Sequence, residues 1–361
     1  MLKPTVLLLF AASIGGLKAQ IGGTGAYSIL RSPMHARALA WGGYMSSQST
    51  PDPLQATSNP ALLRPEHHLN AAFSAGSLLP TIQTANAICA WHTGRNEHVD
   101  SIKRNKPVVA LTAQFINYGD MLSFDNGGNP LPGISANETN IALMACKPIR
   151  QNWYAGAQLG MVYSILGPYV SSGVHVTLAT TYVNHDSTIT TSLLAKNLGM
   201  QVITYRNAPR ESLGPNLEYS VCFRPKHMPF RFHFTAHNLQ RWDLTYNQFK
   251  ESTGQVDLSG NPVIQEEAGF GEKLARHLAV GIEMAMGKNL SFLFGYSDQR
   301  RKEMNNDYYR GPAGFGWGMK FRFLQCDITY SSASYFPGYN SNVFSLILNT
   351  HRFVRKPAIK N

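Results

Sequence analysis

The sequence predicts an all-β protein: a transmembrane antiparallel β-barrel of about 14 strands with an N-terminal plug segment. Three observations lead to this class, namely a signal-like start, segments that alternate apolar with small or polar residues, and connections whose lengths alternate between short and long. Charged residues are only 15% of the 361 residues, against roughly 25% in soluble domains. No later segment is long and apolar enough for a helical span, so strands with one lipid-facing side are expected.

Residues 1–19 have the features of a secretory signal peptide. Lys3 gives a basic start, Thr5–Ile14 is an apolar or small-residue run, and Ala19 precedes Gln20. The run is shorter than the about 20 residues of a membrane-spanning helix. We therefore expect export and residence in the outer membrane of a Gram-negative bacterium; a buried amino-terminal strand is the alternative.

Alternation with a period of two marks the strands. In Phe230–Ala236, for example, phenylalanine or alanine alternates with arginine, histidine or threonine. The more polar faces are mostly Gly, Ala and Ser, unlike the charged water-facing side of a soluble sandwich, which indicates that the apolar faces meet lipid. Fourteen such segments are predicted, at residues 67–75, 82–91, 107–115, 138–147, 153–165, 173–183, 188–196, 215–223, 230–239, 277–286, 290–297, 314–322, 324–332 and 342–350.

The connections support this assignment independently. Links after even-numbered segments are short, at residues 148–152, 184–187, 224–229, 287–289 and 323, whereas long links follow odd-numbered segments, at residues 116–137, 197–214, 240–276 and 298–313. Outer-membrane barrels have short periplasmic turns and long outer loops, so the long links are placed outside the cell. The long polar link 92–106 is an exception to this pattern.

Residues 20–66 lack strand alternation and are expected to enter the lumen as a plug. Ser32 and Pro33 are suited to cap and begin a short helix there. Wide barrels are often plugged, and a loose periplasmic arm is the alternative. The predicted organisation is a signal peptide at 1–19, a plug at 20–66, the barrel at 67–353 and a short tail at 354–361.

Inward-facing polar residues predict how the plug is held. Buried ionisable groups in membrane proteins are expensive and often functional, and here binding of the plug is favoured over a transport pathway. The residues expected at the plug and lumen are Asn59, Pro60, Glu218, Arg231, His233, Glu283, Lys320 and Arg322.

No motif indicates catalysis, a cofactor or a metal. Gly22–Gly25 lacks the strand and helix that flank a phosphate-binding loop, and no serine lies in a GxSxG elbow. The histidines lack companion ligands at metal spacing, and Asp125–Asn129 lacks the remainder of an EF-hand loop. We therefore expect a protein without enzymatic activity.

The cysteines and the net charge indicate the state of the thiols and the kind of partner. Four cysteines in an exported chain allow two disulfides, but their mid-strand positions favour free thiols over bridges; they are Cys89, Cys146, Cys222 and Cys326. The net charge of +11 suits anionic lipid or nucleic acid. Export and the lack of a dense basic stripe argue against nucleic acid.

Several motifs resemble a known family. Arg37–Gly43, followed by Asp52 and Asn59–Ala61, is similar to the entry segment of FadL-like long-chain fatty-acid transporter barrels and of the PorV/PorQ group of the type IX secretion system of Bacteroidota. Further motifs that resemble this group in order and spacing are 117–120, Tyr169 with 172–173, 196–201 with Tyr205, and 237–244 with Tyr246. The resemblance covers essentially the whole mature chain.

The resemblance implies a 14-stranded FadL-like barrel in the attachment complex at the cell surface. Such a barrel would anchor a PorZ-like partner beside a PorU-like sortase and a PorV-like shuttle, embedded in outer-membrane lipid. A FadL-like transporter of hydrophobic molecules is the alternative.

The longest outer loop, 240–276, is where a partner is expected to bind, because aromatic residues in a polar surround are favoured interface anchors. For Trp242 and Tyr246 the aromatic girdle of the barrel is the alternative. The predicted partner-binding residues are Trp242, Tyr246, Phe249, Glu266 and Glu267.

Overall fold

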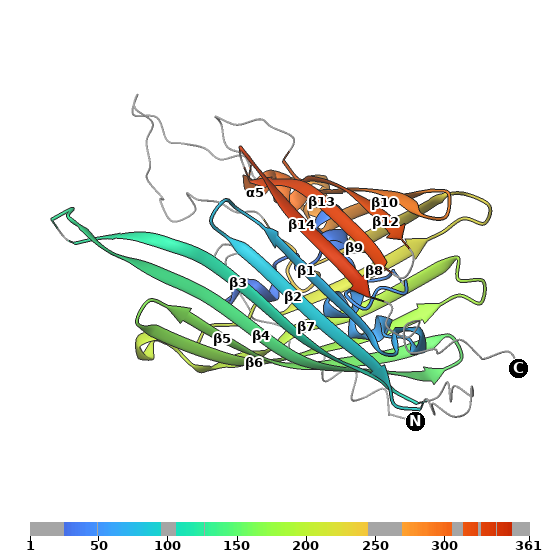
Figure 1. Ribbon diagram of the computed structural model, residues 1–361, viewed down its shortest axis with the longest axis horizontal. Helices are drawn as coiled ribbons and strands as arrows, with labels where there is room; N and C mark the ends of the chain where they lie inside the picture. Colours follow the sequence, from blue (N-terminus) through green and yellow to red (C-terminus); the bar gives the residue numbers. More distant parts are fainter. Residues whose placement is uncertain are drawn as a thin grey trace, which may run out of the picture.

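The computed structural model describes residues 25–48, 50–94, 106–125, 127–244, 269–304, 313–323, 326–336 and 338–348. Within these ranges fourteen antiparallel strands form a closed barrel (Figure 1). Each strand pairs with its neighbours in sequence, and β1 closes the barrel against β14 from Ala71↔Leu348 to Ser77↔Asn342. The predicted fold class is confirmed. The predicted signal peptide and C-terminal tail lie outside the described residues.

Every predicted segment corresponds to one strand. The strands are β1 Asn70–Ser77, β2 Gln83–His92, β3 Val108–Phe124, β4 Pro130–Arg150, β5 Trp153–Leu166, β6 Tyr169–Val183, β7 Ile189–Ile203, β8 Asn216–Phe223, β9 Phe230–Ala236, β10 Leu278–Met286, β11 Leu290–Ser297, β12 Phe315–Phe323, β13 Cys326–Phe336 and β14 Tyr339–Leu348.

Three strands run well past their predicted bounds: β3 at its end, β4 at its start and β7 at its end. The extra lengths follow β-bulges, where the pairing register shifts between Asn117 and Asp120 in β3 and beside Asn197 in β7. Gly119 and Asn197 have positive φ angles of 74° and 58° at these points. A bulge inserts one residue and shifts the inward–outward alternation, so a search for strict alternation ends the strand too early.

The side chains alternate between the lumen and the outer wall as predicted. Glu218 and Thr235 are fully buried, whereas Phe234, next to Thr235, is 49% exposed on the outside. Along β12, Trp317 is exposed and Lys320 buried in the same way. The apolar outer wall therefore suits contact with lipid. All four cysteines are free thiols in the structure.

Residues 25–48 and 50–69 lie inside the barrel and run along its length (blue in Figure 1). The backbone N–H of Ala26 donates to Ser212 in the β7–β8 link (2.9 Å), and that of Leu69 donates to Ala90 in β2 (2.8 Å). We call the end of the barrel that carries the β7–β8 link the loop end and the opposite one the turn end. The segment between them, here called the plug, contains 3-10 turns and short helices: η1 Ser28–Leu30, α2 Ala36–Ala40, α3 Gln55–Ser58, η2 Pro60–Leu62 and η3 Pro65–His67.

The start of α2 differs from the prediction. The helix begins at Ala36, not at Pro33, and its N-cap is His35, whose Nδ1 accepts from the backbone N–H of Ala38 (3.2 Å). Ser32 does not cap it, because its hydroxyl donates to the carbonyl of Ser28 (3.0 Å). A local competing hydrogen bond therefore moved the helix start by one turn.

The remaining helical segments belong to the loop end. They are η4 Tyr205–Asn207, α4 Phe270–Arg276 and α5 Asp298–Met304. None of the helices in the described part of the chain has the length and apolar character needed to cross a membrane.

Candidate functional site

Glycines in the barrel wall accommodate the plug. Trp41 is fully buried, and its ring stacks on His233 with centroids 5.0 Å apart. A Cβ atom on Gly281 would lie 2.7 Å from Cγ of Trp41, and one on Gly295 would lie 2.4 Å from the carbonyl oxygen of Ala40. The sequence predicted small residues on the inward faces of the strands but did not single out these two positions. The structure shows that their lack of a side chain lets the plug backbone approach the wall.

Gly295→Ala should weaken plug docking by about 1–3 kcal/mol, the usual cost of overpacking. The added methyl group would meet the backbone of Ala40 and Trp41, which cannot rotate away as a side chain can. The matched control is Gly271→Ala, where nothing lies within 4 Å of the added Cβ. Hydrogen exchange of plug peptides measures the effect, and equal plug protection in the two variants would contradict the proposed close fit.

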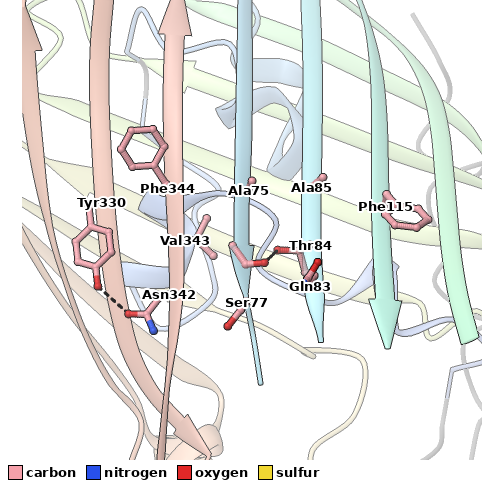
Figure 2. Close-up of a pocket in the computed structure, with 11 residues that line it drawn as sticks. Ala75, Ser77, Gln83, Thr84, Ala85, Phe115, Tyr330, Asn342, Val343 and Phe344 are labelled. Atoms are coloured by element: carbon pink, nitrogen blue, oxygen red, sulfur yellow. Dashed lines mark hydrogen bonds between the residues drawn. The ribbon is translucent and has the colours of Figure 1, made fainter. Parts of the chain in front are cut away.

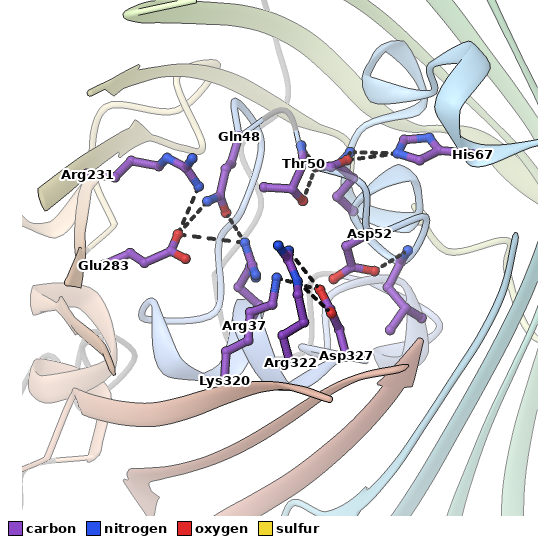
Figure 3. A network of polar contacts seen from close by, with 12 residues as sticks. Arg37, Gln48, Thr50, Asp52, His67, Arg231, Glu283, Lys320, Arg322 and Asp327 are labelled. Atoms are coloured by element: carbon purple, nitrogen blue, oxygen red, sulfur yellow. Dashed lines mark hydrogen bonds and ion pairs between the residues drawn. The ribbon is translucent and has the colours of Figure 1, made fainter. Parts of the chain in front are cut away.

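One wall carboxylate, Glu283, is at the centre of a network of polar contacts in the lumen (Figure 3). Its Oε2 accepts from Nη1 of Arg231 in the neighbouring strand (2.9 Å) and from Nε2 of Gln48 in the plug (2.6 Å). Nη1 of Arg37 lies 3.7 Å from the same oxygen and donates to Oε1 of Gln48 (2.7 Å). The network therefore joins the plug to β9 and β10 by charge and by hydrogen bonds.

Half of this network was predicted from the sequence. Arg231 and Glu283 were expected in the lumen, whereas Arg37 was noted only as part of a motif and Gln48 was not expected to be a site residue. Arg37 is fully buried, and a buried guanidinium requires a carboxylate partner. The signal that could have found it is an arginine within a segment already expected to enter the lumen.

A second wall carboxylate, Glu218, holds another part of the plug. It is fully buried and accepts from the hydroxyl of Ser46 (2.6 Å) and from Nδ2 of Asn216 (2.6 Å). Nζ of Lys196 on the adjacent strand lies 3.2 Å away and balances its charge. The plug is thus bound on this side by a neutral donor and carries no charge of its own there.

Asn59 and Pro60 lie in the plug, where they were expected from the sequence. The fully buried side chain of Asn59 donates to the carbonyl of Ser46 (2.6 Å) and to Thr181 of β6 (3.2 Å). Pro60 lies against Gly156 of β5, where an added Cβ would be 2.5 Å from the Pro60 carbonyl carbon. Asn59 therefore joins two parts of the plug to each other and to β6 of the wall.

Lys320 and Arg322 behave differently from the plug-binding role expected of them. Nζ of Lys320 lies 2.7 Å from Oδ2 of Asp327, and Nε of Arg322 lies 3.0 Å from Oδ1 of the same carboxylate. Arg322 and Asp327 are directly opposed on β12 and β13, and the Arg322 side chain is 47% exposed. Their ion pairs therefore tie two wall strands together, because the register offers a nearer carboxylate than the plug does.

Two buried plug histidines are held in their neutral form. The backbone N–H of Arg64 donates to Nδ1 of His67 (3.1 Å), so the ring proton is on Nε2, which donates to the carbonyl of Thr50 (2.8 Å). Burial lowers the pKa of His67 to about 4 and that of His35 to about 3. Protonation of either ring at Nδ1 would remove a helix-capping acceptor.

The predicted partner-binding loop is described only at its ends. Trp242 is 50% exposed; its ring packs against Phe270 of α4 (5.2 Å between centroids) and stacks on His277 (5.7 Å). Tyr246, Phe249, Glu266 and Glu267 lie outside the described residues. Among the described residues, no group of three His, Cys, Asp or Glu side chains is placed to hold a metal ion.

A groove of about 510 Å³ crosses the outer wall where β14, β1 and β2 meet (Figure 2). Its floor is formed by small residues, among them Ala75, Gly76 and Ala85, and its sides include the aromatic rings of Phe115 and Phe344. Polar groups also line it: Ser77, Gln83, Thr84, and the pair in which the hydroxyl of Tyr330 donates to Asn342 (2.8 Å). Sequence reasoning missed the groove because alanine at an outward position does not break the alternation.

No family model and no curated protein sequence matches this chain. Among solved structures, the CymD monoaromatic hydrocarbon channel matches with a TM-score of 0.50 and 12% identity over 89% of this chain and 98% of that one. The toluene transporter TodX of Pseudomonas putida matches with a TM-score of 0.51 and 9% identity over 88% and 97% of the two chains.

A Pseudomonas aeruginosa FadL homologue also matches, with a TM-score of 0.46 and 10% identity over 87% of this chain and 97% of that one. At such identities the similarity concerns the fold alone. CymD is described as a channel and TodX as a transporter, and each resembles this chain over nearly its whole length. The chain therefore shares the fold of these two proteins and forms a closed fourteen-stranded barrel.

Proposed function

We propose that the protein is a noncatalytic outer-membrane barrel that admits small hydrophobic molecules at its outer wall. The observation that carries this proposal is the groove between β14 and β2, which has an apolar floor on the face that meets lipid. A hydrophobic molecule dissolved in the bilayer reaches such a groove without crossing water. The fold shared with the monoaromatic hydrocarbon channel and the toluene transporter supports the same class of ligand.

An apolar cluster behind the wall supports a path from the groove towards the lumen. Val343 lines the groove and also packs with Leu39 of plug helix α2 and with Leu78 in the β1–β2 link. Gly76 closes the wall at this point, because its backbone approaches Val343 so closely that an added Cβ would lie 2.6 Å from Cα of Val343. A shift of α2 would therefore expose apolar side chains next to the groove.

The experiment fills the groove with a bulky side chain. Ala85→Trp should lower uptake of toluene several-fold in cells that lack another channel, because the indole ring would occupy the groove floor. Ala87→Trp is the matched control: it lies two residues further along the same strand, also faces outward, and is not part of the groove. Equal uptake by the two variants, or no uptake by the wild-type barrel above background, would refute the proposal.

A second function, surface attachment, is favoured by the filled lumen. Trp41, Arg37 and Asn59 are fully buried in the plug, and Glu218 and Glu283 bind it to the wall. We propose as the alternative that the barrel anchors a PorZ-like surface protein beside PorU-like and PorV-like components of a type IX secretion system. Purification of the native membrane protein separates the two functions: a bound apolar molecule supports the channel, and a bound surface protein supports the anchor.

A further inference from the structure

The β3–β4 hairpin continues beyond the rest of the barrel (Figure 1). Strand β2 stops pairing with β3 at Asn117, and β5 stops pairing with β4 at Ala136. Beyond these points β3 and β4 pair only with each other, from Asp120↔Ser135 to Phe124↔Pro130. We call residues 120–134 the ribbon. Among the described strands, none pairs with either outer edge of the ribbon.

Hydrogen bonds define the conformation of the ribbon at its tip and at its base. At the tip, Oδ1 of Asp125 accepts from the backbone N–H groups of Gly127 and Asn129 (2.8 Å each), and Oδ2 accepts from Nδ2 of Asn129 (2.9 Å). These hydrogen bonds lower the pKa of the Asp125 carboxyl. At the base, Gly119 has a positive φ of 74° in a bulge and its N–H donates to Asn117 (3.0 Å). Hydrogen bonds thus hold the described residues of the hairpin at its tip and at its base.

The two edges of the ribbon differ. The β4 edge contains Pro130 and Pro132, which have no N–H to donate, and a bulge lies between its pairs at Leu131 and Ile134. Proline and bulges are the usual protection of an edge strand. The β3 edge, residues 120–124, has no proline and no lysine, and it carries Leu122, which is 85% exposed. The β3 edge therefore lacks the prolines and the bulge that protect the β4 edge.

We propose that the β3 edge of the ribbon binds an extended strand of a surface protein, with an apolar side chain of that strand against Leu122. Strand addition satisfies the unpaired N–H and C=O groups of an edge, and a two-stranded ribbon alone is only marginally stable in water. Lipid cannot be the occupant, because unpaired backbone groups are not tolerated in hydrocarbon. The inference rests on the attachment function for the existence of a partner and adds where that partner binds.

The test uses a photo-crosslinking amino acid in the full-length protein in intact cells. Placed at position 120 and, separately, at position 122, it should crosslink to two residues of one partner segment that are two positions apart, as the register of a ladder requires. The same probe at Gly133, exposed on the β4 edge, is the matched control and should crosslink at least fivefold less. Crosslinks between two copies of this chain, or crosslinks without a ladder order, would overturn the proposal.

A deletion separates this inference from the attachment function itself. Replacing residues 120–134 with an Asn-Gly turn should leave a folded, heat-modifiable barrel but reduce the copurified partner at least tenfold. Shortening 249–268, in the loop predicted to bind the partner, is the comparison. A partner retained without the ribbon but lost on shortening 249–268 would overturn the ribbon site and keep the attachment function. Absence of any surface protein on the wild-type barrel would overturn both.

Discussion

Glu283→Ala should release the plug from the wall and destabilise its docking by about 3–5 kcal/mol, the cost of breaking a buried ion pair from one side. The substitution leaves the fully buried Arg37 and the largely buried Arg231 without their carboxylate. It also removes the acceptor of the Gln48 amide. Hydrogen exchange of peptides from residues 36–62 should show loss of protection, while the barrel strands remain protected.

The matched control is Glu272→Ala. Glu272 also has two basic partners, Arg276 (3.0 Å) and Lys302 (2.9 Å), but its side chain is partly exposed on α4. Exposed pairs contribute about 0–1 kcal/mol, so plug protection should not change. If Glu283→Ala and Glu272→Ala have the same small effect, the plug is held by packing and not by the Glu283 network.

Acidification should loosen the plug as the pH falls from about 6.5 to about 4. The folded-state pKa of His67 is lowered to about 4 from the ordinary value of 6.5. As the pH falls, His67 is therefore protonated at a higher pH in the released plug than in the docked plug. The stability due to neutral His67 is present above pH 6.5 and is lost as the pH falls towards the folded pKa. The loss is at most about 3 kcal/mol for a shift of this size. His35, with its pKa lowered to about 3, acts in the same direction.

Asp52 opposes this effect, because burial raises the pKa of its carboxyl. Its protonation at low pH relieves a desolvation cost and favours the docked plug. His67→Gln separates the contributions: hydrogen exchange of the plug should depend less on pH in this variant than in wild type. His185→Gln, at an exposed turn residue, is the control and should keep the wild-type profile. An unchanged pH profile in His67→Gln would show that His67 does not govern docking.

The outer part of the protein shows why some element bounds could not be read from the sequence. Alternation located all fourteen strands because a barrel wall separates lipid from lumen at every second residue. It failed at Gly119 and Asn197, where a bulge shifts that alternation and the strand continues in the other phase. It also gave no indication of the groove, which depends on which small residues of β1 and β2 lie side by side.

The sequence by itself determined the architecture and the polarity of the two faces of the wall, since both depend on a local period of two. It also determined that Glu218, Arg231 and Glu283 face inward. Only the tertiary structure decided their partners. Arg37 and Gln48 contact Glu283 although they are 235 or more residues away in the chain. Lys320 and Arg322 pair with Asp327 of the wall and not with the plug. Side-chain pairing depends on distance in space, and the closure of the barrel around its own N-terminal segment sets that distance.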